Sequence, residues 1–385
     1  MTISTSPPSQ KFWVHRPFWI LSLAIFLNAF SYGVAAVSTT WLAQHSAWSL
    51  WHLTWAPTGL IIGILSGGIT ADHIGRTRLL HWSPVGYVVG GLILLVVKSH
   101  SLSAWGCLAL VITAGLESTT VLALGHELLP PSTRTSAFYL MMNFSNFGGL
   151  VLAILTAMPM HPGVRQTVIT LIPVILAILS WQLRRKLPES PEWFHARAPK
   201  PTSSKPFYLT SRFATSVIFS YTNATGFALV TYALGVKIYP QLLPHFLMLS
   251  TGGAFIAGLA SPLFAKLPVS TLLLGSYGGT WLFALALWAY PTIHWALWLG
   301  LSVATGVAFL AENEFKTSAW PSKIRGRVTA WERVGGQLGY LGTLIAVQHF
   351  SFPQLTLALA GIWAMGAGAA LWWRIFSSGD GARQE

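Results

Sequence analysis

One acidic residue, Glu117, falls in the middle of a long apolar stretch of the chain. An ionisable side chain at such a depth is costly, so it is usually kept because it carries a proton or contacts a bound solute. The alternative is a protonated carboxyl group that hydrogen-bonds one helix to another. Glu117 therefore ranks first among the residues expected to hold a proton.

Amide and hydroxyl side chains interrupt several other apolar stretches. Such groups either line a polar cavity or hydrogen-bond neighbouring helices. Asn143 and Asn146 are three residues apart, which puts both on one face of a helix. Both alternatives stay open for each residue. The predicted proton- and solute-binding residues are Glu117, Asn28, Tyr32, Asn143, Asn146, Tyr221, Asn223 and Gln337.

Other kinds of chemistry find no support in the sequence. The single cysteine, Cys107, excludes an intrachain disulfide and a cysteine-based metal site. No two histidines are spaced four residues apart on one helix face, and no glycine-rich phosphate-binding loop occurs. We therefore expect no metal ion, no cofactor, no direct use of ATP and no enzymatic activity.

The elements that must position these residues are transmembrane helices. Hydrophobic residues make up 53% of the 385 positions and charged residues 9%, whereas soluble domains carry about 25% charged residues. Apolar stretches of about 20 residues, the length that crosses a bilayer, recur along the chain. We predict an all-α membrane protein with twelve spans, at 18–43, 52–72, 79–98, 102–127, 135–160, 164–183, 208–236, 240–264, 269–290, 293–313, 328–349 and 353–376.

The net charge of +13 is explained by membrane orientation, and no nucleic-acid partner is expected. With twelve spans, every Lys and Arg except Lys98, Arg165 and Lys237 falls on one side, which the positive-inside rule makes cytoplasmic. Both termini are then cytoplasmic. The first apolar stretch, 18–43, is too long for the core of a cleavable signal peptide. The expected location is therefore the inner (plasma) membrane.

A polar segment divides the predicted spans into two sets of six. It is rich in Pro, Ser and basic residues, and it gives an N-terminal half at 1–183, a cytoplasmic linker at 184–207 and a C-terminal half at 208–385. The second half faintly repeats the first, since PSKIRG at 321–326 resembles PSTRTS at 131–136. Two such halves typically enclose a cavity that opens to either side in turn.

The segment 68–78, with the sequence GITADHIGRTR, follows the second predicted span. It resembles the signature loop of the major facilitator superfamily, which runs Gly, two residues, Ala, Asp, two residues, Gly, Arg, one residue and a basic residue. In that family the loop latches the two halves of a transporter in the outward-open state. A positively charged loop without such a role is the alternative. The matching loop residues are Gly68, Asp72, Gly75, Arg76 and Arg78.

Further matches flank other predicted spans. The segment 188–191, PESP, resembles the one that follows span six in sugar porters, although Glu192 stands where relatives carry a basic residue. The region between spans four and five fits the family's Glu, Pro, Arg pattern, and the region before span eleven fits it in part. The resemblance implies a gating network of inner-face salt bridges, with solvated loop ends as the alternative. Its expected members are Glu127, Arg134, Glu189, Arg325 and Arg333.

The matches point to the branch that holds sugar porters, aromatic-acid symporters and related metabolite carriers. At two places the sequence differs from the pattern of this branch. Thr222 and Asn223 replace a Gln-Gln pair of sugar porters, which disfavours a hexose, and span one lacks the Asp that symporters of the branch carry. Glu312 and Glu314, near the inner end of span ten, are expected to join inner-gate salt bridges more than to contact solute.

The resemblance implies a secondary transporter that works by alternating access. We expect proton-coupled uptake of a small organic solute, either an organic acid or a polar metabolite. The chain is expected to be a monomer whose partners are the solute, protons and the lipid bilayer. The alternatives are efflux of drugs or metabolites in exchange for protons and a non-transporting membrane sensor on the same fold. If Glu117 carries the proton, Glu117→Gln abolishes accumulation and spares exchange.

Overall fold

The computed structural model describes residues 15–43, 50–96, 100–196, 210–290, 294–318 and 320–376. Every regular element within these ranges is helical. The long helices are α1 (Arg16–Ala43), α2 (Leu50–Ile74), α5 (His100–Leu128), α6 (Arg134–Ala157), α7 (Pro162–Arg184), α9 (Ser211–Ala228), α10 (Leu243–Leu259), α12 (Val269–Ala289), α13 (Trp295–Ser318), α14 (Ser322–Ala346) and α15 (Phe352–Phe376). The shorter ones that matter below are α3 (Arg76–Trp82), α4 (Pro84–Val96), α8 (Pro191–Ala196) and α11 (Ser261–Phe264).

Ten segments of the described chain are long and apolar enough to cross a membrane. The two remaining predicted spans are also helical but miss that threshold, α10 because it has 17 residues and α14 because it carries charged side chains along its first half. The predicted all-α fold is therefore confirmed. The division at 184–207 stays a prediction, because residues 197–209 and both chain ends lie outside the described ranges.

Some predicted boundaries were wrong for identifiable reasons. The third span divides at Ser83 into α3 and α4, since Pro84 has no N–H to donate to the carbonyl one turn earlier. The seventh span continues beyond α9 as a π-helix, Leu229–Ile238. The eleventh begins at Ser322, before the predicted 328, because Arg325 of α14 is buried against Glu127 of the other half instead of lying in solvent.

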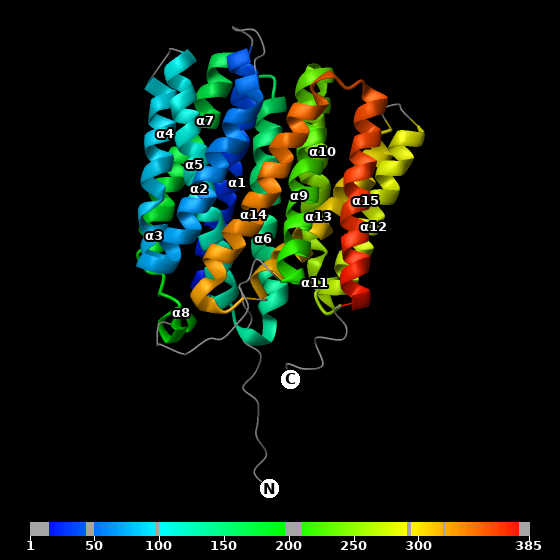
Figure 1. The fold of residues 1–385 in the computed structure, drawn as a ribbon. Helices are drawn as coiled ribbons and strands as arrows, with labels where there is room; N and C mark the ends of the chain where they lie inside the picture. The colour runs from blue at the N-terminus through cyan, green and yellow to red at the C-terminus, as the bar shows by residue number, and fades with distance from the viewer. Residues whose placement is uncertain are drawn as a thin grey trace.

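The helices form two bundles that lie side by side, α1 to α7 and α9 to α15, with α6 and α14 near their boundary (Figure 1). Across that boundary α14 packs against α2, and α10 packs against α6. The first contact is close because Gly68 lacks a side chain. A Cβ atom there would lie 2.4 Å from the Cβ of Ala330 and 2.8 Å from the carbonyl oxygen of Gly326.

The outer faces of both bundles are apolar. On α7, Leu171, Ile175 and Leu179 follow one another at four-residue spacing and are each 40–54% exposed. On α15, Leu357 and Met365 are about half exposed. Because soluble proteins rarely expose continuous apolar faces, these surfaces are the ones that contact lipid.

Candidate functional site

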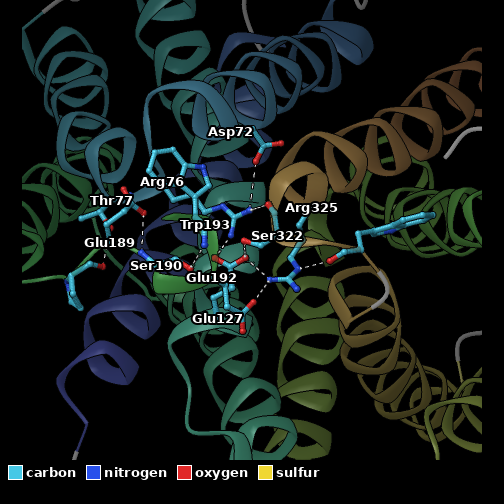
Figure 2. A network of polar contacts seen from close by, with 12 residues as sticks. Asp72, Arg76, Thr77, Glu127, Glu189, Ser190, Glu192, Trp193, Ser322 and Arg325 are labelled. Atoms are coloured by element: carbon cyan, nitrogen blue, oxygen red, sulfur yellow. Dashed lines mark hydrogen bonds and ion pairs between the residues drawn. The ribbon is translucent and has the colours of Figure 1, made fainter. Parts of the chain in front are cut away.

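A charge network joins the two halves at one end of the bundle; we define it by Asp72, Arg76, Glu127, Glu192 and Arg325 (Figure 2). Glu127, at the end of α5, forms ion pairs with Arg76 of α3 and with Arg325 of α14. The side chains of Arg76 and Glu127 are both 0% exposed. Because a buried charge that loses its partner is strongly unfavourable, each of these buried side chains requires its oppositely charged partner.

Hydrogen bonds to α14 extend the network across the boundary. Arg76 Nη2 donates to the carbonyl oxygen of Ser322 at 2.6 Å, and Ser322 Oγ donates to Glu127 Oε1 at 2.6 Å. Asp72 accepts from the backbone N–H of Arg327 at 2.8 Å and lies 3.5 Å from Arg76 Nη2. The start of α14 is therefore fixed against α2, α3 and α5 by ionic and backbone contacts together.

The PESP segment anchors α8 beneath this network. Glu189 accepts from the backbone N–H of Thr77 at 3.1 Å and so remains on the N-terminal side. Glu192, the acid that departs from the family pattern, lies 3.2 Å from Arg325 Nη1 and 3.7 Å from Arg134 Nη2. Glu192 thus links α8 to Arg134 of the N-terminal half and to Arg325 of the C-terminal half.

Most of the predicted charged residues meet in the network, but Glu189, Arg78 and Arg333 do not. Gly75 ends α2 with a φ of 108°, a backbone conformation that glycine readily adopts, and so turns the chain into α3. Arg78 is exposed and makes no hydrogen bond or ion pair with the described residues. Arg333 lies instead on the wall of a central cavity.

The central cavity lies between the halves and has a volume of about 280 Å³. Five predicted residues line it, from α1, α6, α9 and α14: Asn28, Tyr32, Asn146, Asn223 and Gln337. Asn143 and Tyr221 lie outside its wall. Asn143 donates to the carbonyl oxygen of Phe255 at 3.1 Å, and the hydroxyl of Tyr221 is 2.9 Å from Thr343 Oγ1. These two side chains hydrogen-bond neighbouring helices, which was the alternative for each.

Glu117 is also outside the cavity, so its expected place on the wall is corrected. It is 0% exposed within the N-terminal half and forms an ion pair with Arg184 of α7. Ser83 and Tyr87 donate hydrogen bonds to the same carboxylate, the latter at 3.3 Å. Arg184 Nη1 also donates at 2.9 Å to the carbonyl oxygen of Leu80, the group that Pro84 cannot pair. The pair therefore joins α5 and α7 to the break between α3 and α4.

This environment predicts that the Glu117 side chain stabilises the folded protein. We expect Glu117→Gln to destabilise the protein by about 3–5 kcal/mol, since Arg184 keeps a buried charge without its partner. In detergent this corresponds to a melting temperature lower by about 5–10 °C. The double variant Glu117→Leu, Arg184→Met should recover most of the loss, because it removes both charges. Equal instability of the single and double variants would contradict the ion pair as the cause.

Three charged side chains line the cavity, and sequence reasoning had placed none of them there. Glu312 and Lys316 form an ion pair one turn apart on α13. Glu312 also accepts hydrogen bonds from Asn223 and, at 3.2 Å, from Ser220 Oγ. The signal for the pair was its spacing, because acid and base four residues apart meet on one helix face.

Arg333 is the third charged residue on the wall. It makes no ion pair or hydrogen bond with any described residue. Gln337 lies one turn further on the same face of α14, and its Oε1 is buried without a hydrogen-bond partner among the described residues. The described cavity wall thus holds one carboxylate and two cations. On α14 the guanidinium of Arg333, which Glu312 attracts without direct contact, lies beside the free amide oxygen of Gln337.

The fold and these sites define a class: a helical membrane protein whose two halves enclose a polar cavity and are tied together at one end. Residues 21–343 match the Major Facilitator Superfamily, and the chain belongs to that family. It is therefore a secondary transporter, not an enzyme. No curated protein matches the sequence.

Solved structures of other transporters share the fold at low identity. The proton:xylose symporter XylE, known from E. coli, is 15% identical with a TM-score of 0.72, over 94% of this chain and 95% of that one. The transporter FucP, in an outward conformation, is 15% identical with a TM-score of 0.69, over 92% and 98%. The human organic anion transporter MFSD10 is 12% identical with a TM-score of 0.72, over 95% and 100%.

Proposed function

We propose that this chain is a proton-coupled transporter of a small organic anion. The observation that carries the proposal is the charge of the described cavity wall, where the single carboxylate of Glu312 forms an ion pair with Lys316 and also attracts Arg333 from a longer distance, which leaves one net positive charge. A guanidinium that makes no direct ion pair binds a carboxylate strongly in a space of low dielectric, through two parallel hydrogen bonds. A cationic drug would find the cavity carboxylate already engaged, which disfavours the efflux alternative.

Glu312 is the proposed proton carrier, in place of Glu117. Its carboxylate faces the cavity and is held by Lys316 and Asn223. When a proton adds to the Glu312 carboxylate, the acid becomes neutral and Lys316 loses its ionic partner. The Lys316 ammonium then pairs with the anion of the solute. Proton and anion binding would thereby favour each other, as linked ligands do.

Two structural neighbours have related activities. XylE is a proton:xylose symporter and MFSD10 is an organic anion transporter. At 15% and 12% identity the likeness extends to the fold alone, so the proposal rests on the cavity charges. The charge network supports transport over a passive sensor role, because it ties the two halves together through contacts that can break and re-form.

We further propose that this chain lies in the plasma membrane and that the end of the bundle with the charge network faces the cytoplasm. Most Lys and Arg residues follow or precede helices at that end, as the positive-inside rule requires. Uptake from the opposite side would then run with the inward proton gradient. If a cysteine that replaces Lys323 were labelled by a reagent added outside intact cells, that labelling would contradict this orientation.

The direct test of the function is proton movement in proteoliposomes. Aromatic acids, dicarboxylates, nicotinate, neutral sugars and cationic dyes are each added outside, and the external pH is followed. We expect alkalinisation with one class of carboxylate. A response to sugars or dyes alone would overturn the anion assignment, and solute uptake without any proton movement would overturn the coupling.

A substitution at Glu312 tests the proton carrier. Glu312→Gln should abolish accumulation driven by a pH gradient, because the amide cannot take up a proton, while exchange of internal for external solute persists. Glu314→Gln is the matched control, since Glu314 lies two residues along α13 and does not line the cavity. Proton-driven accumulation by Glu312→Gln at the wild-type level would exclude this role.

A further inference from the structure

A second pocket lies in the C-terminal half, apart from the central cavity and its proposed function. It has a volume of about 310 Å³ and lies where α9 and α12 begin and α13 and α15 end. These helix ends are on the same side of the bundle as the charge network (Figure 1). The residues that matter for its chemistry are Arg212, Ser270, Phe315, Ser318, Trp373 and Arg374.

The described lining of this pocket combines two guanidinium groups with two hydroxyl groups and no carboxylate. Ser270 lies in the first turn of α12, ahead of Thr271, where the backbone hydrogen bonds of the helix to the carbonyl oxygen of Pro268 begin. Arginine binds phosphate oxygens through paired hydrogen bonds, and hydroxyl and backbone N–H groups add further donors. The set is therefore suited to an anion with several oxygen atoms.

Arg212 is held in position before any ligand binds. Its guanidinium carbon lies 4.6 Å from the ring centre of Phe315 and 5.6 Å from that of Trp373. Its Nη2 donates to the carbonyl oxygen of Phe315 at 3.1 Å, and its Nε is buried without a hydrogen-bond partner among the described residues. A fixed guanidinium loses little side-chain entropy when it binds, which favours affinity.

The position of the pocket indicates where such an anion comes from. The last turns of α15 expose Leu371, Trp372, Ile375 and Phe376 to the surroundings of the bundle. Tryptophan concentrates at the level of lipid headgroups, and basic pockets between helices bind phosphate headgroups there. We propose that this pocket binds the phosphate group of an anionic phospholipid.

Thermal unfolding in detergent tests the proposal with phosphatidylglycerol, phosphatidylcholine and sodium phosphate as separate probes. We expect phosphatidylglycerol to raise the melting temperature of the wild type in a saturable way and phosphatidylcholine to have little effect. Arg374→Gln should lose at least half of that rise. Ser270→Asp should lose it too, because its carboxylate occupies the pocket while remaining favourable at the start of a helix.

Arg185→Gln is the matched control. Arg185 also stacks on a tryptophan, with its guanidinium carbon 4.5 Å from the ring of Trp181, but it lies at the end of α7 and lines neither pocket. It should keep the full response to phosphatidylglycerol. An undiminished response in both pocket variants, or an equal response to phosphatidylcholine, would overturn the site. Saturable stabilisation by sodium phosphate with no added effect of lipid would assign the pocket to a free anion instead.

Discussion

Replacing Arg333 with glutamine is expected to weaken binding of the transported anion about 100-fold, the largest effect on affinity of any single change in the cavity. Truncating one partner of a desolvated charge pair costs about 2–5 kcal/mol, and about 1.4 kcal/mol is a factor of ten in affinity. Arg333 makes no other ion pair or hydrogen bond with the described residues, so the variant should remain folded. The measurement is the dissociation constant for the carboxylate that moves protons with the wild type.

Two further variants define the cause of that loss. Arg333→Lys keeps the positive charge but not the paired geometry, so it should recover part of the affinity. Lys323→Gln removes a positive charge from an exposed position of the same helix and should leave the affinity unchanged. If the Lys323 variant lost as much affinity as the Arg333 variant, the effect would be a general one of net charge and not of the cavity.

Replacing Glu127 with glutamine is expected to lower the maximal transport rate about tenfold or more with little change in affinity. The variant leaves the buried guanidinium groups of Arg76 and Arg325 without their shared carboxylate. A cost of roughly 3 kcal/mol to the state closed at this end would change its population about 100-fold. Since the cavity residues are untouched, the solute itself should bind as before.

The shift in population can be measured by thiol labelling. The only cysteine, Cys107, is 0% exposed, so a cysteine introduced at Thr305 on the cavity wall reports access to the cavity. In the Glu127 variant, a membrane-impermeant reagent should label this cysteine faster from the network end alone. Glu189→Gln is the control, because Glu189 bonds to Thr77 on its own side of the boundary. Equal labelling rates in wild type and Glu127→Gln would contradict a gating role for the network.

The sequence by itself determined the class of fold and most of the charge network. Apolar stretches of span length are a local property, and the confirmed helices follow them closely. Asp72 and Arg76 were predicted in the signature loop, and Glu127 and Arg325 in a gating network, because all four belong to short motifs next to helix ends. The backbone turn at Gly75 and the entry into α14 then bring them within reach of one another.

Only the tertiary structure decided which buried polar residues face the cavity. A helix in lipid is apolar all round, so its hydrophobic pattern does not reveal which side meets the opposite half. Glu117 faces α7 and pairs with Arg184, which the sequence had placed at the edge of the linker. Arg333 was predicted to join the gating network, yet it lies on the cavity wall. The rotation of α14 that puts it there is set by packing against α2 and α9.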